Sequence, residues 1–239
     1  MLQTTNGIVF NSVRYSDQAV ICRIFTQKFG LKPFMVRLGK SSKSSGRAAI
    51  QPLSLIAAEM YIKENAQVQT LQNLRIERPL QQIYMDPSKS ATVMFLDEIL
   101  YRSIQDDYAN ADLFGFLYDA IVLLDEEVET KNFHLWFILE LTRHYGFYPQ
   151  KLADVVHRHF DLAEGVFVSA PPAHPHFTDS RLTPILDLFV DKIYSEVRSV
   201  DMSKLDRANL LEALLKYLKL HLENFREIKS LEVFKQVFQ

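Results

Sequence analysis

Two pairs of histidines are the residues of this sequence whose types and spacing come closest to a metal site. His157 and His159 flank an arginine, and His174 and His176 flank a proline. Alternate residues of an extended chain share a face, and imidazole nitrogens bind zinc, so the four rings could surround one ion. Structural zinc sites made of histidine alone are uncommon, however, and the chain around these residues is rich in proline. We therefore expect no metal or other cofactor, and we keep zinc binding by these four histidines as the alternative.

A glycine, a lysine and a serine at positions 39–41 resemble the end of a phosphate-binding loop. Such a loop requires another glycine five residues earlier, where this chain has Phe34, and a helix directly afterwards, where a Ser/Gly-rich stretch follows. No Ser/His/Asp, Cys/His or paired-carboxylate arrangement stands out in the sequence, and the single cysteine, Cys22, lies in an apolar run typical of a core. We therefore expect a protein that binds its partners and is not an enzyme.

Lysine and arginine are concentrated at the N-terminal end of the chain. The first 80 residues hold 11 basic and 4 acidic side chains; because the whole chain holds 27 and 29, the remaining residues hold 16 and 25. Eight of the 11 fall between Arg14 and Arg47, where Asp17 is the only acid. This asymmetry favours binding of a polyanion by the N-terminal part. The residues that we expect to contact nucleic acid are all basic: Arg23, Lys32, Arg37, Lys40, Lys43 and Arg47.

Aromatic residues are interleaved with these basic residues, as is typical of proteins on which unpaired bases stack. They are Tyr15, Phe25, Phe29, Phe34 and Tyr61. Most of them are expected to fill the interior of a small β-domain, Phe25 and Tyr61 in particular.

Alternating and apolar runs in the first third of the chain predict five strands. They cover about residues 7–14, 18–26, 32–38, 50–62 and 68–78. Gly30 is placed to take a positive φ in a hairpin loop, and the stretch from Gly39 to Arg47 is expected to be a mobile cationic loop. Five strands in about 75 residues are typical of an OB-type barrel, a fold that often binds oligonucleotides.

After Pro79 the apolar period changes from 2 to about 3.6, which predicts helices. Asp86 and Asn110 are expected to cap the first two, and a helix at 131–145 is apolar on nearly all sides. Further helices are expected to begin at Thr183 and to continue past Phe189, and to begin at Ser203 and Ser230. The expected fold is therefore α+β: an OB-type barrel domain at 1–79 and an all-α domain at 80–239, which an irregular segment interrupts at about 148–178.

Several short motifs along the chain resemble RecO, a bacterial family of recombination mediators in DNA repair. They are Gly7-Ile8-Val9, Tyr15-Ser16-Asp17, Ile50-Gln51-Pro52-Leu53-Ser54, Tyr145-Gly146-Phe147-Tyr148-Pro149 and Phe160-Asp161-Leu162-Ala163-Glu164-Gly165. The resemblance covers most of the chain. It implies an OB-fold followed by a helical domain, binding of single- and double-stranded DNA and annealing of complementary strands. It also implies partnership with RecR and with single-stranded DNA-binding protein in loading RecA.

The sequence departs from the RecO pattern in one respect. Many members of the family carry two Cys-X-X-Cys pairs after the central helix, which form a zinc site, and this chain has no cysteine there. The spacing of the histidine pairs does not match that of the family's cysteines. We therefore interpret residues 148–178 as a zinc-finger-like remnant without metal.

The acidic C-terminal part is the expected docking region for protein partners. An acidic, apolar-ended tail such as that of single-stranded DNA-binding protein needs a groove between helices and a nearby cation. Arg226 and Lys229 are the candidate cations, next to a stripe formed by Leu214, Leu218 and Leu222 that we expect to be buried. The alternative function is an OB-fold adaptor that binds proteins and does not contact DNA. Neither a signal peptide nor a membrane span is predicted, so a cytoplasmic protein is expected, and the resemblance to RecO implies association with the nucleoid.

Overall fold

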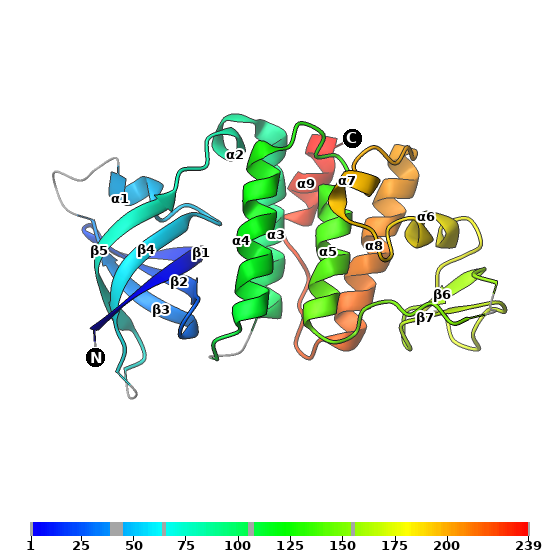
Figure 1. The fold of residues 1–239 in the computed structure, drawn as a ribbon, viewed down its shortest axis with the longest axis horizontal. Helices are drawn as coiled ribbons and strands as arrows, with labels where there is room; N and C mark the ends of the chain where they lie inside the picture. The colour runs from blue at the N-terminus through cyan, green and yellow to red at the C-terminus, as the bar shows by residue number, and fades with distance from the viewer. Residues whose placement is uncertain (1, 39–44, 64–65, 105–107, 154–155, 239) are drawn as a thin grey trace. The chain divides into compact units, whose positions relative to one another are not determined.

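The chain divides into two compact units in its computed structural model (Figure 1). The first unit holds Met1–Glu126 and Ile228–Phe234, and the second holds Glu127–Glu227 and Lys235–Gln239. The first unit therefore contains helices as well as the barrel, and the domain boundary expected at Pro79 stays a prediction. The structure describes residues 2–38, 45–63, 66–104, 108–153 and 156–238.

Five strands of the first unit close into a barrel, which confirms the expected architecture (Figure 1). Its order around the barrel is β1-β2-β3-β5-β4, and every pair is antiparallel except β3 and β5. A short helix, α1 (Ser45–Ala48), lies between β3 and β4 in the sequence. The strands are β1 (Leu2–Ser16), β2 (Ala19–Thr26), β3 (Gly30–Arg37), β4 (Leu55–Tyr61) and β5 (Gln69–Arg78).

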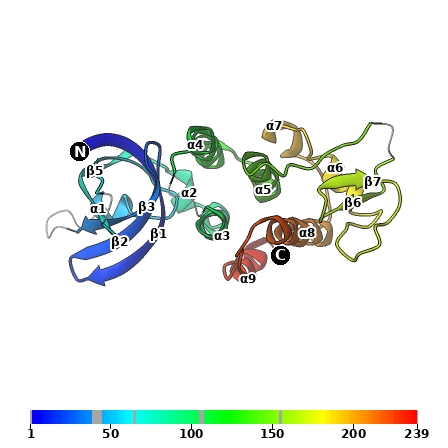
Figure 2. The same cartoon turned by 90° about the horizontal axis from the view of Figure 1, so that it is seen from below.

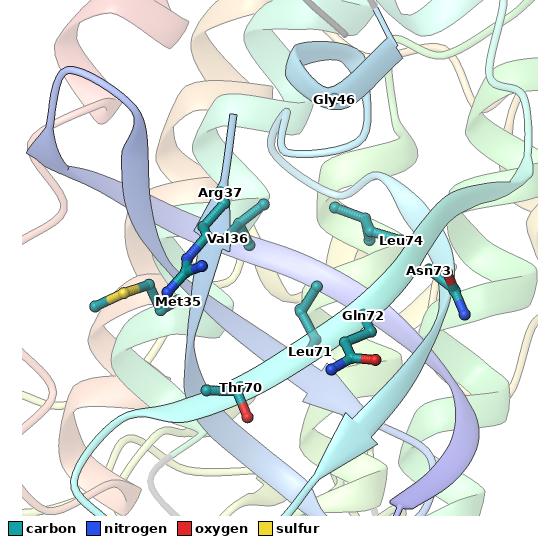
Figure 3. Close-up of a pocket in the computed structure, with 9 residues that line it drawn as sticks. All are labelled: Met35, Val36, Arg37, Gly46, Thr70, Leu71, Gln72, Asn73 and Leu74. Carbon is teal, nitrogen blue, oxygen red and sulfur yellow. The ribbon is translucent and has the colours of Figure 1, made fainter. Parts of the chain in front are cut away.

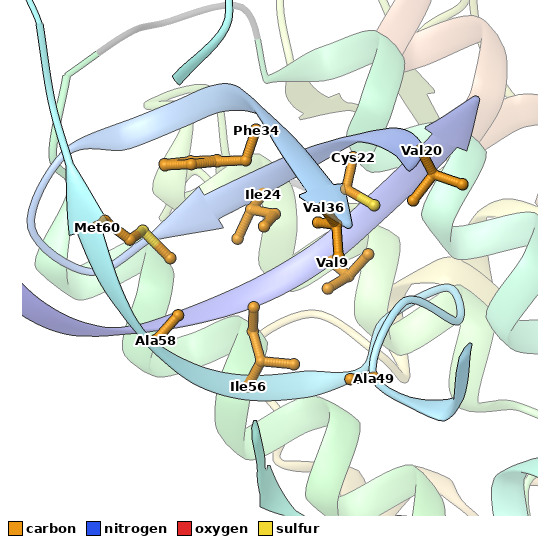
Figure 4. Packing of buried hydrophobic residues seen from close by; sticks show 10 residues of the cluster. All are labelled: Val9, Val20, Cys22, Ile24, Phe34, Val36, Ala49, Ile56, Ala58 and Met60. Carbon is orange, nitrogen blue, oxygen red and sulfur yellow. The ribbon is translucent and has the colours of Figure 1, made fainter. Parts of the chain in front are cut away.

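The interior of the barrel is filled by alternate residues of its strands (Figure 4). On β2 the inward residues include Cys22 and Ile24, both with at most 1% of their surface exposed. Burial raises the pKa of the Cys22 thiol to about 12, so it packs as a neutral apolar side chain. Gly7 of β1 also faces the interior, where an added Cβ would lie only 2.6 Å from Cγ2 of Ile24. A residue without a side chain is therefore required at this position.

The strand predicted at 50–62 is shorter than expected, because β4 begins only at Leu55. Residues before it form turns, and Leu53 has a φ of 58°. Pro52 has no N–H to donate to a ladder, and the left-handed backbone of Leu53 turns the chain before it can pair. The predicted positive φ of Gly30 is confirmed at 68°.

The predicted starts of the first two long helices are confirmed. Asp86 accepts hydrogen bonds from the backbone N–H groups of Ser88 and Lys89 at the start of α3 (Pro87–Ser103). Asn110 accepts one from the N–H of Leu113 in α4 (Ala111–Glu126). Figure 2 views both helices nearly end-on beside the barrel of their unit. The short α2 (Gln82–Met85) precedes them, and the first unit also includes the start of α9 (Leu231–Phe238).

The second unit is built around α5 (Phe133–His144), which is buried on nearly all sides as its sequence predicted. Gly146, with a φ of 84°, follows its end. The remaining elements are β6 (His159–Asp161), β7 (Val166–Val168), α6 (Thr183–Asp187), α7 (Tyr194–Val197) and α8 (Lys204–His221). The predicted start of α8 is confirmed, because the Ser203 hydroxyl accepts a hydrogen bond from the N–H of Asp206.

The long helix predicted from Thr183 past Phe189 is wrong, because α6 ends at Asp187. Asp191 has a φ of 64°, which a continuing helix does not allow. Its N–H donates to the hydroxyl of Tyr148 at 2.7 Å and not to a helical carbonyl. A distant tyrosine thus supplies a partner for the backbone after the helix has ended. None of the described helices is long and apolar enough to cross a membrane.

Candidate nucleic-acid interface

The outer surface of β1, β2 and β3 carries continuous rows of side chains. Val13 pairs with Ile21, Ile21 pairs with Met35, and Met35 pairs with Thr70 of β5. The adjacent ladder positions on β2 and β3, Cys22 and Phe34, point into the core, so this row points outward. Val13 is 61% exposed. The face is therefore open toward the β1–β2 hairpin, whereas its other end packs against helices, with Phe25 only 1% exposed and its ring 6.0 Å from that of Phe114 on α4.

Arg37 lies at the hairpin end of this outer face. Arg37 pairs with Ala19, and Ala19 pairs with Ser16. Because Arg37 follows Met35 by two positions on β3, its side chain also points outward. Its side chain is exposed, and no acid among the described residues forms an ion pair with it. Tyr15, at a bulge in β1 between Arg14 and Ser16, is 65% exposed. An unpaired cation and an open aromatic ring thus occur at the same end of the barrel.

Arg23 and Lys32 lie on opposite sides of the β2–β3 ladder. Arg23 pairs with Pro33 and points outward, where its guanidinium lies 5.0 Å from the ring centroid of Tyr101 on α3. Lys32 pairs with Ile24, a core residue, so its side chain leaves the ladder on the other side. The two residues therefore do not share one strand face, although the sequence analysis grouped them.

The cationic segment after β3 is only partly described. Arg47 lies in α1 and is exposed. Lys40 and Lys43 lie outside the described residues, so their expected contact with nucleic acid stays a prediction. Two other arginines of the barrel are paired with acids, Arg14 with Asp17 and Arg78 with Glu126. Their charges are therefore partly neutralised, whereas no ion pair within the described ranges involves Arg37 or Arg47.

A cavity of about 510 Å³ lies where β3 and β5 separate (Figure 3). The two strands pair at only two positions, Phe34 with Gln69 and Met35 with Thr70. Farther along, they diverge, and the opening is lined by residues of both strands and by Gly46 of α1. The sequence does not indicate this cavity, since neither charge nor periodicity marks the place where two strands distant in sequence separate.

The aromatic residues divide into buried and exposed groups. Phe25 is buried, but the expectation that it fills the barrel is wrong: Ile24 takes the inward position, and the outward Phe25 ring lies 6.0 Å from the rings of Phe10 and of Phe114 on α4. The expectation that Tyr61 fills the barrel is wrong, because it is 40% exposed. Met60 takes the inward position, so the next residue must point outward, with the Lys63 ammonium 5.5 Å from its ring centroid. The alternation of β4 was the signal that could have placed Tyr61 correctly.

Comparison with known proteins covers almost the whole chain. The family model described as "Recombination protein O N terminal" matches residues 1–80, and "Recombination protein O C terminal" matches residues 85–232. The chain belongs to the RecO family. The "DNA repair protein RecO" of Flavobacterium psychrophilum is 34% identical, with 98% of both chains covered. Those of Flavobacterium johnsoniae and Phocaeicola vulgatus are each 33% identical, with 98% and 100% of both chains covered. The protein is therefore a RecO-family DNA repair protein.

In this RecO-family chain the two histidines of the first pair have separate partners. His157 Nδ1 lies 3.3 Å from Oδ1 of Asp187, and His159 Nδ1 lies 3.0 Å from the Thr178 carbonyl oxygen. The ring centroids of His174 and His176 lie 5.8 Å apart, and the backbone N–H of His176 donates to His174 Nδ1. Within the described ranges, no three histidine, cysteine, aspartate or glutamate side chains come together as a metal site would require. The absence of metal stays a prediction, which needs a measurement on the protein.

The residues expected to meet a protein partner fall in different units of the RecO-family fold. Arg226 belongs to the second unit and Lys229 to the first, and both side chains are exposed. The leucine stripe of α8 is packed inside its own unit, as expected, because Leu214 and Leu218 are at most 1% exposed. These two leucines are therefore not an open groove.

Proposed function

We propose that the chain binds single- and double-stranded DNA through its barrel and anneals complementary strands. We also propose that it acts with RecR to load RecA onto DNA covered by single-stranded DNA-binding protein. The observation that carries the DNA-binding proposal is the exposed Arg37 at the open, β1–β2 hairpin end of the barrel, which forms no ion pair among the described residues and shares this end with the exposed ring of Tyr15. Membership of the RecO family supports the wider recombination role.

The phosphate backbone is the part of DNA that these cations are suited to bind. Arg37 and Arg47 provide guanidinium groups, which donate paired hydrogen bonds to phosphate oxygens. Lys40 and Lys43 belong to the same basic stretch of sequence, and Arg23 and Lys32 add positive charge to the barrel. Contacts to phosphates do not depend on sequence, so we propose general affinity for DNA.

Annealing is a consequence of the same charge. Two complementary strands repel each other through their phosphates, and cations that neutralise part of this charge lower the barrier to their meeting. Strand pairing then needs no chemical step, and we propose that the protein is a mediator and not an enzyme. Its substrate is chromosomal DNA, so we propose that it acts in the cytoplasm at the nucleoid.

Partner recognition is the proposed role of the C-terminal part. The acidic tail of single-stranded DNA-binding protein carries carboxylates, which Arg226 or Lys229 would meet. A surface for RecR is also proposed, without assignment to particular residues.

Salt-dependent binding tests the proposal against a protein-only adaptor. Single-stranded, double-stranded and complementary oligonucleotides are mixed with the protein, and retardation and annealing rate are measured at several salt concentrations. We expect binding to all three, with affinity that falls as salt rises, and faster annealing than without protein. An adaptor that does not contact DNA would retard none of them at physiological ionic strength.

A further inference from the structure

The cavity between β3 and β5 has an apolar floor. Val36 is 3% exposed and belongs to the barrel core, and Leu71 and Leu74 pack against that core from β5. Figure 3 shows the two leucines on the inner side of the opening. The barrel wall is therefore open at this cavity, and a ligand that enters it would contact residues of the barrel core.

The rim of the same cavity is polar and carries a positive charge. Thr70 and Gln72 are exposed, and Asn73 has a φ of 51° at an irregularity in the β4–β5 register. Arg37 lines the opposite side, on β3. No acidic side chain is among the residues that line the cavity within the described part of the chain.

An apolar floor, a rim of amide and hydroxyl groups and an adjacent guanidinium match one kind of ligand. A nucleobase has apolar faces and a hydrogen-bonding edge, and its chain carries a phosphate beside it. A cavity of about 510 Å³ lies in the range of about 300–1,000 Å³ that is usual for small-molecule sites. In a duplex the bases are stacked and paired, so only an unpaired strand can present one freely.

We propose that this cavity is a base-binding subsite: an unpaired nucleobase of single-stranded DNA enters between β3 and β5 while Arg37 holds a neighbouring phosphate. The inference rests on the proposed DNA-binding function and adds a preference of this site for unpaired strands. Asn73 faces the hydrogen-bonding edge of the base and Leu71 and Leu74 contact its face, while Gln72 lies on the rim outside these contacts.

A reversible block of the cavity tests this subsite. Cys22 is buried, so a Gln72→Cys variant carries one accessible thiol at the rim. A benzyl methanethiosulfonate reagent converts that thiol to a bulky mixed disulfide, and a reducing agent removes the group again. The matched control is Thr4→Cys. Thr4 pairs with Glu59 and Glu59 pairs with Gln72, so the control lies in the same outward row, two strands away from the cavity.

Two single-stranded probes of equal length are compared by fluorescence anisotropy: oligothymidylate, and an oligomer made entirely of abasic units with the same phosphates. We expect the unmodified variant to prefer oligothymidylate by about tenfold or more, since a bound base is worth about 1–3 kcal/mol. Blocking the rim should lower this preference about tenfold, and reduction of the mixed disulfide should restore it. The slope of log affinity against log salt should stay unchanged. The Thr4→Cys protein should keep its preference after the same treatment.

Three results would overturn the subsite. Equal binding of the two probes by the unmodified protein would mean that bases are not bound at all. An equal loss of affinity for both probes on blocking would mean that the group disturbs phosphate contacts only. Absence of salt-dependent binding to either probe would overturn the proposed function together with the subsite, whereas the first two results leave general DNA binding intact.

Discussion

His174 Nε2 lies 3.2 Å from Oδ2 of Asp161, a carboxylate whose side chain is only 8% exposed. The other oxygen of Asp161 accepts the backbone N–H groups of Ala163 and Glu164, and His174 Nδ1 accepts the N–H of His176. Imidazole and carboxylate thus hold together part of the irregular segment at about 148–178, for which the sequence predicts a zinc-finger-like remnant. We infer that these contacts stabilise the segment without an ion.

The first prediction is that the protein needs no metal. Protein purified without a histidine tag should contain no stoichiometric zinc by elemental analysis, and its melting temperature should not change when a chelator is added. His174→Ala should instead lower the melting temperature, because the buried Asp161 loses its partner. One zinc per chain that disappears in a His157→Ala/His174→Ala variant would contradict the prediction.

The second prediction concerns the exposed ring of Tyr15. Tyr15→Ala should weaken binding to single-stranded DNA by about 1 kcal/mol or more, because an unpaired base loses a stacking partner. Affinity for duplex DNA should change little. Tyr108→Ala is the control, since Tyr108 is 80% exposed in the same unit and lies outside the barrel. An equal loss for single and double strands would argue against stacking.

The third prediction concerns Asp97 of α3. Burial, with a further contribution from the charge of Glu98, raises the pKa of its carboxyl from 3.8 to about 8. Its Oδ1 atom is buried without a hydrogen-bond partner among the described residues. Between these pH values the folded state keeps a proton that the unfolded state has lost. The contribution of Asp97 to stability is therefore fully present below about pH 4 and is lost as the pH rises toward 8.

Asp97→Asn should remove this loss of stability with rising pH, because an amide does not titrate. The variant should unfold at higher denaturant concentration than the wild type at pH 8, and the difference should shrink toward pH 4. Each pKa unit corresponds to about 1.4 kcal/mol, so the free energy of unfolding should differ between variant and wild type by several kcal/mol at most. Unfolding is followed by circular dichroism and not by tryptophan fluorescence, because Asp97 lies in the first unit and the single tryptophan, Trp136, lies in the second. A difference that grows as the pH falls would contradict the assignment.

The fourth prediction concerns partner binding. Arg226→Glu or Lys229→Glu should weaken binding to a peptide with the acidic, apolar-ended sequence of the tail of single-stranded DNA-binding protein, because the new carboxylate repels those of the peptide. The two changes are made separately, since the residues belong to different units. Affinity for bare DNA should stay nearly constant, and Lys131→Glu serves as the control. Parallel loss of peptide and DNA binding would mean that the two sites overlap.

Local rules predicted many elements of this fold correctly. Asp86, Asn110 and Ser203 were expected to begin helices, and each accepts a hydrogen bond from a backbone N–H in the first turn. Capping depends on residues within three positions of one another, so the sequence alone is sufficient. The same is true of Gly30, whose turn is closed by neighbours in the chain.

Features that depend on distant residues could not be predicted in this way. The apolar residues after Asp187 suggested a longer helix, but the N–H of Asp191 bonds to Tyr148, 43 positions away. The cavity at the β3–β5 seam likewise depends on where two strands far apart in sequence diverge. Charge predicted which unit carries basic residues, whereas only the ladder register placed Arg23 and Lys32 on opposite sides.

The salt dependence of DNA affinity in matched variants decides whether the basic N-terminal part binds DNA. We compare the wild type with Lys40→Ala/Lys43→Ala/Arg47→Ala and with Lys131→Ala/Lys204→Ala/Lys219→Ala, which removes the same charge from exposed positions of the second unit. Each phosphate contact adds about 0.7 to 0.9 to the slope of log affinity against log salt. The first variant should therefore bind all sequences more weakly, with a slope smaller by about 2 to 3, and the second should match the wild type. Equal slopes in all three proteins, or equal loss in both variants, would contradict DNA binding by the basic N-terminal part.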